Sequence, residues 1–266
     1  MIIDAHTHIF PDHQAASVLQ HTARMFNVPV YGTGTASDLL SQMDSAGIDY
    51  AVIHMVAPSP SQVKETNTWL INLKQDRFIK SGTLHPFFKN NADEIKRLQD
   101  NAIHTVKLQP DIQLFYPHDR STLYPLYESI CRYNMNVMFH IGGEPLPGPN
   151  DRSTPEMISA VASDFPDMTI IGAHLGGLNM WDEVLKHLAG KTNVYFESSL
   201  SYSYISVKTA EKIIRTHGHR KIFFGTDYPF APVNESLQKA RTVAFLEADE
   251  ISGILGNNAC ALFAPA

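Results

Sequence analysis

The feature that most constrains the fold is a regular alternation along the chain, in which short β-branched or aromatic runs are separated by amphipathic segments of helical period. This alternation is typical of βαβ units, which build parallel sheets. The runs predict eight strands, at residues 2–6, 50–56, 78–84, 105–108, 136–141, 169–173, 193–197 and 221–226. Helices are expected near residues 36–46, 61–75, 92–100, 121–133, 154–164, 179–188, 206–217 and 234–246. Eight strands each followed by a helix predict an α/β fold, a (β/α)₈ TIM barrel with right-handed crossovers.

The length of the chain allows one large domain. It has 266 residues, 44% of them hydrophobic, and α/β barrels commonly reach this size as a single unit. No linker, low-complexity stretch or block of charge divides the chain, so we predict a single domain over residues 1–266. An open doubly wound sheet is the rival interpretation, but no Gly-x-Gly-x-x-Gly motif follows a predicted strand.

Charge and cysteine content narrow the class of partner. The formal net charge is −6 and no dense run of Lys or Arg is present, so neither nucleic acid nor an anionic membrane is expected as a partner. Cys131 and Cys260 are too few for a disulfide framework and fit a reducing compartment. The first residues lack the apolar run of a signal peptide, and no other run is long enough to cross a bilayer. The sequence therefore predicts a cytoplasmic protein that acts on a small molecule.

Polar residues stand at the ends of several predicted strands. His6 and His8 end the first strand, and residues two apart in a strand point to the same face. Two imidazoles side by side suit Zn²⁺ or a similar first-row metal. Later strand ends carry Lys107, His140, His174 and Asp227. Because catalytic groups in a TIM barrel come from the carboxyl ends of its strands, these side chains are expected to converge on one mouth.

Five short motifs carry a family resemblance. They are Asp4-Ala5-His6-Thr7-His8, Val106-Lys107-Leu108-Gln109-Pro110, Phe139-His140-Ile141-Gly142-Gly143, Ala173-His174-Leu175-Gly176-Gly177 and Gly225-Thr226-Asp227-Tyr228-Pro229. In this order they resemble the amidohydrolase-related family, the branch of the metal-dependent amidohydrolase superfamily that also contains aminocarboxymuconate semialdehyde decarboxylase-like enzymes. The resemblance covers nearly the whole chain. It is specific for superfamily and branch but not for substrate.

The resemblance implies a divalent metal held by His6, His8, His140 and Asp227. It also implies that His174 is a catalytic proton donor or, as in two-metal relatives, a further ligand. Three neutral imidazoles and a carboxylate leave room for water at a zinc-like centre, where the pKa of water falls from about 15.7 to about 7. Asp227 would also accept a proton from the attacking water. The ligand set favours zinc by its chemistry but admits manganese, iron or cobalt.

Lys107, at the end of the fourth predicted strand, has more than one interpretation. In binuclear relatives a lysine there is carboxylated and bridges two metals. In this branch it could equally pair with a substrate carboxylate or a nearby acid. We favour an uncarboxylated Lys107 and one metal ion, because carboxylation cannot be read from a sequence.

Two long loops are expected at the mouth of the barrel. Residues 9–35, which include Arg24, are expected as a loop that folds over the mouth as a cap. The Pro- and Gly-rich residues 142–149, which include Glu144, follow a predicted strand and are expected as a second loop of this face. Arg24 is a candidate clamp for a substrate carboxylate.

Further substrate-binding residues are predicted near the fourth and seventh strands. Gln109 and Tyr116 belong to the loop after strand four. Glu197 ends strand seven, where it either lines the floor of the pocket or hydrogen-bonds a ligating histidine. With Lys107 and Arg24, these residues suit a small carboxylated or cyclic substrate.

We favour a metal-dependent hydrolase that cleaves a lactone, ester or amide of a small metabolite with metal-activated water. The alternative is a metal-dependent nonoxidative decarboxylase of an unsaturated or aromatic carboxylic acid, in which His174 handles a proton. The two functions share the same ligands and differ in the substrate that the cap recognises. No decisive arginine for the acid of a decarboxylase is evident in the sequence.

Two other functions rank lower. A TatD-type deoxyribonuclease also begins with a His-x-His strand, but its fourth strand supplies a carboxylate where this chain has Lys107, and the acidic charge balance disfavours DNA. A metal-binding barrel without catalysis would be expected to lose a ligand, and none is missing here. A homodimer is a further hypothesis, from the frequency of symmetric dimers among enzymes of this size.

Overall fold

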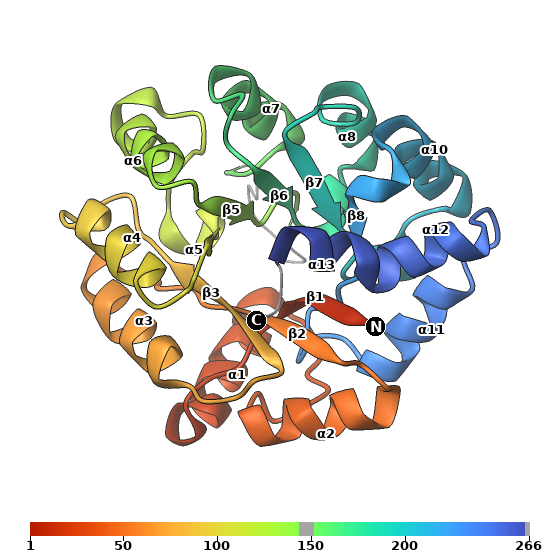
Figure 1. Cartoon of the computed structure of the whole chain (residues 1–266), viewed down its shortest axis with the longest axis horizontal. Helices are drawn as coiled ribbons and strands as arrows, with labels where there is room; N and C mark the ends of the chain where they lie inside the picture. Colours follow the sequence, from red (N-terminus) through yellow and green to blue (C-terminus); the bar gives the residue numbers. More distant parts are fainter. Residues whose placement is uncertain (144–151, 264–266) are drawn as a thin grey trace.

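The computed structural model describes residues 1–143 and 152–263, and Glu144 lies outside the described residues. Its centre is an eight-stranded parallel sheet in the order β1 to β8, with each strand hydrogen-bonded to the next along the chain (Figure 1). The strands are β1 (Ile3–Thr7), β2 (Tyr50–His54), β3 (Phe78–Thr83), β4 (Thr105–Leu108), β5 (Asn136–Phe139), β6 (Ile170–Gly172), β7 (Val194–Glu197) and β8 (Ile222–Phe223). The predicted TIM barrel is confirmed.

Helices surround the strands on the outside of the barrel (Figure 1). The longer ones are α1 (Asp12–Phe26), α2 (Ala36–Ala46), α3 (Val63–Asn72), α4 (Asn91–Gln99), α6 (Arg120–Arg132), α7 (Pro155–Asp164), α8 (Trp181–His187), α10 (Val207–His217) and α11 (Val233–Arg241). The short ones are α5 (Pro110–Gln113), α9 (Ser201–Tyr204), α12 (Ala248–Ser252) and α13 (Asn258–Phe263). Among the described residues, no helix combines the length and the apolar character that a membrane span requires.

Local sequence explains where several helices begin. Thr35, Thr154 and Ser206 precede α2, α7 and α10, and each side chain accepts a hydrogen bond from a backbone N–H of the first helical turn. This contact satisfies a donor that the helix leaves unpaired. Helix α2 ends at Gly47, whose φ of 71° lies in the left-handed region that glycine adopts without strain. These signals explain why the predicted bounds of α2 agree with the structure.

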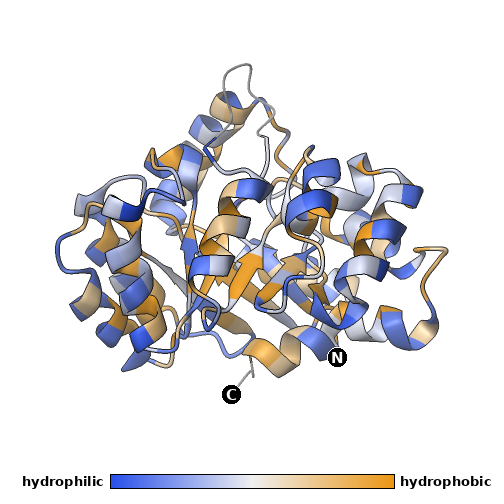
Figure 2. Ribbon diagram, turned by 90° about the horizontal axis from the view of Figure 1, so that it is seen from above, coloured by the Kyte–Doolittle hydropathy of each residue, from blue (hydrophilic) through white to orange (hydrophobic). Residues whose placement is uncertain are grey.

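The core has two parts, because alternate strand residues face opposite sides of the sheet. A large apolar layer lies between the strands and the helices and includes Ala51, Ile53 and Val137. A smaller cluster fills the barrel interior, with Ile3, Val52, Met138, Ile171 and Phe223 among its members. Figure 2 shows the strands as an apolar centre and the helices with polar outer surfaces.

Helix α13 closes the amino-terminal end of the barrel. In Figure 1 it lies across the strands, and Ala259 belongs to the interior cluster. Leu262 and Phe263 pack against the same cluster. The amino-terminal ends of the strands are therefore covered, and the carboxyl ends are left to form a mouth.

The prediction of a loop over residues 9–35 was wrong in one respect, because 15 of these residues form helix α1. Pro11 precedes the helix without a side-chain cap, and only Ala15, Leu19 and Phe26 of the helix are buried. Asn27 ends the helix in the left-handed conformation, but no capping side chain marks its start and no wide apolar stripe marks its length. Its placement depends on tertiary contacts with the rest of the barrel.

The last strand and the last long helix are shorter than predicted. Strand β8 covers Ile222–Phe223 of the expected residues 221–226, and α11 ends at Arg241 instead of residue 246. Phe224, Thr226 and Asp227 still follow the line of the barrel through hydrogen bonds to the first strand and its neighbours. The apolar run at residues 221–226 was therefore placed correctly in the barrel, but its regular strand pairing ends at Phe223.

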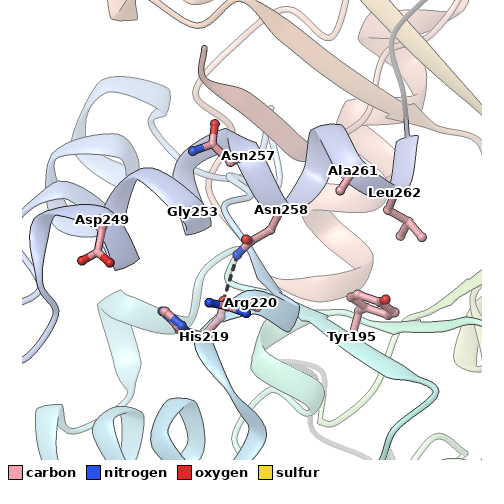
Figure 3. Close-up of a pocket in the computed structure, with 9 residues that line it drawn as sticks. All are labelled: Tyr195, His219, Arg220, Asp249, Gly253, Asn257, Asn258, Ala261 and Leu262. Carbon is pink, nitrogen blue, oxygen red and sulfur yellow. Dashed lines mark hydrogen bonds between the residues drawn. The ribbon is translucent and has the colours of Figure 1, made fainter.

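A cavity of about 410 Å³ lies at the amino-terminal end of the barrel, near α13 (Figure 3). It is lined by Tyr195, His219, Arg220, Asp249, Gly253, Asn257, Asn258, Ala261 and Leu262. The Asn258 side chain donates hydrogen bonds to the carbonyls of His219 and Ile222 and so ties the last helix to the start of β8. Among the described residues, the groups arranged to hold a metal lie elsewhere.

Candidate metal centre

Three donor atoms converge at the carboxyl end of the barrel. His6 is in β1, His8 follows it, and Asp227 follows β8, which lies beside β1 where the barrel closes. The Nε2 atoms of His6 and His8 are 3.0 Å apart. Asp227 Oδ1 lies 3.3 Å from His6 Nε2 and 3.4 Å from His8 Nε2. Two ring nitrogens and a carboxylate oxygen at this spacing can share one divalent ion.

The opposite ring nitrogens of the two histidines are already engaged. His6 Nδ1 donates to Glu197 Oε1 at 2.8 Å, and His8 Nδ1 donates to the backbone carbonyl of His54 at 2.9 Å. A neutral imidazole carries one proton, so these contacts leave the lone pair of each histidine on Nε2. Such outer contacts orient metal-ligating histidines and raise their basicity. Both histidines are therefore held in the tautomer that a metal needs.

Glu197 is fully buried at the end of β7 and receives several hydrogen bonds. Besides His6, its carboxylate accepts from the backbone N–H of His174 at 2.9 Å and from the backbone N–H of Ser199 at 2.7 Å. The Ser199 hydroxyl donates to the same carboxylate at 2.8 Å. A buried charge is tolerated when it is fully hydrogen-bonded, so Glu197 acts as a fixed support beneath His6.

His174 lies beside His140 on the other side of the site. His174 Nδ1 donates to the carbonyl of Ser199 at 3.1 Å, which leaves the lone pair on Nε2. That Nε2 atom is 3.2 Å from His140 Nδ1. The described residues form two groups of three potential ligands that lie close together. One group is His6, His8 and Asp227, and the other is His6, His174 and Glu197. His140 belongs to neither group. The second group shares His6 Nδ1, which Glu197 already engages, so the first suits a metal better.

The backbone at two of these residues is unusual. Asp227 has a φ of 68° and His174 a φ of 59°, in the left-handed region that residues with a side chain rarely adopt. Residues in such conformations persist only when their surroundings hold them there, and they cluster at functional sites. The backbone N–H of Asp227 donates to the carbonyl of His6 at 2.8 Å, which ties the carboxylate-bearing residue to the first histidine.

The electrostatic environment keeps His6 and His140 uncharged. Burial, followed by the positive charge of Lys107, holds the pKa of His6 well below its usual range. Burial, followed by His174 and Lys107, does the same for the pKa of His140. A metal binds neutral imidazole, so the environment favours the ligand form at neutral pH. The convergent donors and their protonation state therefore fit a divalent metal ion.

The donors open into a cavity of about 340 Å³. Its floor carries the histidines, Asp227 and Lys107, and its walls are mainly apolar, with Thr22, Asn27 and Asn179 among the exceptions. The walls include Phe10, Val18, Phe26, Leu178, Leu200 and Phe230. Because α1 and the residues after it contribute several of these side chains, the predicted position of a cap over the mouth agrees with the structure. A cavity of this size suits a small molecule with a polar end and an apolar body.

The structure brings only some of the predicted substrate residues to this cavity. Lys107 and Gln109 line it, and both are buried. Glu197 is absent from the lining and lies beneath His6, which agrees with the second of its two expected positions. Arg24 and Tyr116 are not lining residues, and Tyr116 instead stacks under the Arg152 guanidinium. The cavity therefore gives no support to their prediction as substrate contacts.

Two supporting residues were missed from the sequence. Ser199 contacts His6, His174 and Glu197 through its hydroxyl, with distances of 3.0, 2.9 and 2.8 Å. His54 lines the cavity, and its carbonyl orients His8. The residues Glu197-Ser198-Ser199 at a strand end were the available signal for Ser199. Nothing in the sequence distinguished His54 from the other histidines.

The parallel barrel and the histidine and carboxylate donors at its mouth define a class, the metal-dependent TIM-barrel enzymes. A family model described as "Amidohydrolase" matches residues 3–264, and the chain belongs to this family. The chain is therefore a metal-dependent enzyme of a superfamily that contains both hydrolases and carboxy-lyases. The resemblance inferred from the five motifs is confirmed.

Solved structures with the same fold cover almost the whole chain. 5-Carboxyvanillate decarboxylase from Sphingomonas paucimobilis is 14% identical, with a TM-score of 0.73 and coverage of 100% of this chain and 99% of that one. A dihydroxybenzoic acid decarboxylase from Polaromonas, solved with bound manganese, is 16% identical, with a TM-score of 0.70 and coverage of 99% and 96%. A protein assigned as a 2-pyrone-4,6-dicarboxylic acid hydrolase from Pseudomonas putida is 15% identical, with a TM-score of 0.69 and coverage of 99% and 97%. No curated protein matches the chain.

Proposed function

We propose that the enzyme is a hydrolase that opens a lactone, ester or amide bond of a small carboxylated or cyclic metabolite. The convergence of His6 Nε2, His8 Nε2 and Asp227 Oδ1 within 3.4 Å of one another carries this proposal. His140 would complete the ligand set. A divalent ion there supplies Lewis-acid chemistry and makes water a nucleophile near neutral pH. We propose zinc, and one ion, although a similar barrel holds manganese.

The residues of the chain supply the other parts of the reaction. The Asp227 carboxylate is the general base that accepts a proton from the attacking water. The Ser199 carbonyl holds the proton of neutral His174 on Nδ1, so His174 first takes up a proton at Nε2 and then donates that proton to the leaving oxygen or nitrogen. Lys107, buried at the floor of the cavity, pairs with a carboxylate of the substrate. Gln109 lines the same floor and supports this contact.

A second candidate is a nonoxidative decarboxylase of an unsaturated or aromatic carboxylic acid. The observation that favours it is the buried Lys107 beside the histidines, because a cation at the floor can hold a carboxylate close to His174. In this reaction His174 delivers the proton that replaces the departing carbon dioxide. Two of the three similar barrels described above are named as decarboxylases, and one as a hydrolase. A nuclease remains a lower-ranked proposal.

The two reactions are distinguished by the mass of the product. Protein loaded separately with zinc and with manganese is incubated with a panel of lactones and a panel of unsaturated and aromatic acids. Gain of water supports the hydrolase, and loss of carbon dioxide supports the decarboxylase. If metal binds in stoichiometric amount and neither panel reacts, both proposals are wrong for these substrates.

Asp227 is tested by Asp227→Asn, which preserves shape but removes the charge and the basicity of the carboxylate. Turnover is expected to fall by a factor of about 100 or more, because a general base and a ligand are lost together. Metal content is measured by elemental analysis on the same samples. Unchanged metal content with unchanged turnover would exclude Asp227 from the mechanism. Anomalous scattering that reveals two metals bridged through Lys107 would overturn the one-ion proposal.

A further inference from the structure

Tyr228 directly follows Asp227, and its fully buried side chain points away from the metal donors toward α2. Its hydroxyl donates to Asp38 Oδ2 at 2.6 Å. The same hydroxyl accepts from the backbone N–H of Gly34 at 3.2 Å, and the backbone N–H of Thr33 donates to the same Asp38 oxygen at 2.7 Å. These contacts form a small network, which joins the residue after Asp227 to the end of the long segment over the mouth.

The last part of that long segment, residues 26–34, is called the cap segment here. Phe26, Asn27, Val28 and Pro29 line the cavity above the donors. Further along, the backbone N–H of Tyr31 donates to the carbonyl of Pro229 at 2.8 Å. The cap segment is therefore attached to residues 228 and 229 by both side-chain and backbone contacts.

The cap segment packs tightly on the Tyr228 ring. A Cβ atom added to Gly32 would lie 2.5 Å from Tyr228 Cε2, closer than real Cβ contacts allow. A residue with a side chain at this position would push the ring or the cap segment away. The approach of the backbone to the ring is therefore close enough to transmit a displacement of one to the other.

The other side of Tyr228 contacts the metal donors through the backbone. Its carbonyl accepts from the backbone N–H of His8 at 2.7 Å, and its neighbour Asp227 has the left-handed φ of 68°. Surrounding contacts must hold such a conformation. An aromatic ring anchored at its far end by a hydrogen bond to a carboxylate is a suitable support, because hydrogen bonds to charged groups are the stronger kind.

Asp38 is ionised in this network. Burial raises the pKa of Asp38, but hydrogen bonds from the Tyr228 hydroxyl and the Thr33 N–H outweigh burial and leave the pKa below its usual value. The hydroxyl of Tyr228 therefore donates to a charged oxygen. Tyr228→Phe removes this one atom and keeps the ring.

We infer that Tyr228 is a positioning residue, which holds the Asp227 carboxylate in its ligand geometry and the cap segment over the cavity as one unit through Asp38 and Gly34. The kinetic and zinc-binding consequences rest on the proposed function, whereas the effect on the cap segment does not. Loss of the anchor should loosen the cap segment and weaken metal binding together.

The test compares Tyr228→Phe with Tyr127→Phe. Tyr127 is also fully buried and also donates one hydrogen bond, to the carbonyl of Pro117 at 2.9 Å, but it lies in α6 away from the cavity. In Tyr228→Phe, amide hydrogen exchange of residues 27–34 is expected to speed up by about tenfold to a hundredfold, as for loss of a hydrogen bond to a charged group. Zinc affinity, measured by competition with a chelator, is expected to fall by about tenfold. Tyr127→Phe should change neither quantity.

Cap-segment exchange that is equal in both variants overturns the inference. Faster exchange with unchanged zinc affinity also overturns it, because Tyr228 would then only fasten the cap segment. If Tyr228→Phe does not fold, Asp38→Asn and Gly32→Ala disturb the same network from its other members and are judged by the same two measurements.

Where a substrate has been found, kinetics add a third measurement. A displaced Asp227 lowers kcat, whereas loss of the cap alone raises KM, and the inference requires both changes in Tyr228→Phe. Absence of turnover with every compound of the panel counts against the proposed function. The exchange and zinc measurements still decide the role of Tyr228, because neither needs a substrate.

Discussion

Glu197 shows how a single buried residue can control the site without facing the cavity. Its carboxylate accepts a hydrogen bond from His6 Nδ1, so it determines which nitrogen of His6 is free for a metal. In Glu197→Gln the amide nitrogen can replace the accepting oxygen and oppose that tautomer. Metal affinity is expected to fall by about tenfold to a hundredfold, the usual effect of removing a hydrogen-bond partner of a ligand. Chelator competition on the folded protein measures it.

Glu156→Gln is the matched control, because Glu156 is exposed in the first turn of α7 and the same substitution there should leave metal affinity unchanged. Equal metal affinity of Glu197→Gln and the unsubstituted protein would contradict the assigned role. The sequence alone offered two positions for Glu197, since a strand-end residue faces either the mouth or its neighbouring strands. Only the folded barrel, in which β7 pairs with β8 and Glu197 reaches His6 of β1, decides between them.

His217 provides a pH-dependent stability term far from the metal donors. It is buried in α10, where Nε2 donates to the Val194 carbonyl and Nδ1 accepts from the Gly190 N–H, both at 3.1 Å. The neutral ring satisfies both contacts. Burial, followed by the charge of Lys221, lowers the pKa of His217 from 6.5 to about 4. A proton added to Nδ1 would face the Gly190 N–H.

Because the folded-state pKa is lower than the unfolded one, the unfolded chain takes up the proton first as the pH falls. The contribution of His217 to the unfolding free energy is therefore complete above pH 6.5 and is lost between pH 6.5 and about 4. The loss amounts to about 3 kcal/mol. Urea unfolding at several pH values, for the unsubstituted protein and His217→Gln, measures it as the difference between the two curves. Parallel curves over this range would contradict the prediction.

At the scale of elements, Asn67 joins two helices to a strand. From α3 its amide donates to the Thr83 carbonyl at 2.9 Å and to Glu94 of α4 at 2.7 Å, and its oxygen accepts from the Thr83 N–H at 2.9 Å. Asn67→Ala leaves these buried groups of β3 without their partner. The unfolding free energy is expected to fall by about 3 kcal/mol, as for buried groups left unsatisfied. Urea or thermal unfolding provides the measurement.

The control for this substitution is Asn101→Ala. Asn101 is exposed, and its side-chain amide donates to a single carbonyl, that of Arg97. Water can replace this contact, so the change in unfolding free energy should stay within about 0.5 kcal/mol. If both substitutions cost the same, the proposed link between α3, β3 and α4 contributes little to stability.

Elements differed in how far the sequence predicted them. Helix α2 has a capping Thr35 and a terminal Gly47, and both ends were predicted correctly. Helix α1 has no capping side chain at its start and ends at Asn27 instead of a glycine, and it was expected as a loop. The positions of the strands were predictable from apolar runs, although β2, β5 and β8 end earlier than expected. These runs brought out His6, His8, His174 and Asp227 as neighbours. The apolar walls of the cavity were not, because they come from segments that meet only in the folded barrel.

For the whole molecule, the site lies where the first and last strands of the barrel meet. The chain closes by bringing β8 beside β1, and backbone hydrogen bonds join Ala5 to Phe224 and His8 to Tyr228 across this junction. The proposed ligands His6, His8 and Asp227 stand on its two sides, more than 200 residues apart in the sequence. Unfolding separates them, so a metal held by all three binds only the closed barrel.

A ligand that binds only the folded state raises the unfolding free energy. At a free metal concentration one hundred times the Kd, the increase is about 2.7 kcal/mol. The unfolding free energy of the unsubstituted protein, measured by thermal and urea unfolding, should therefore be higher by this amount with excess zinc or manganese than with a chelator. Asp249→Asn, an exposed carboxylate at the amino-terminal cavity, should behave in the same way. Asp227→Asn should lose most of the metal-dependent increase, and stabilisation equal to that of Asp249→Asn would contradict a metal that bridges β1 and β8.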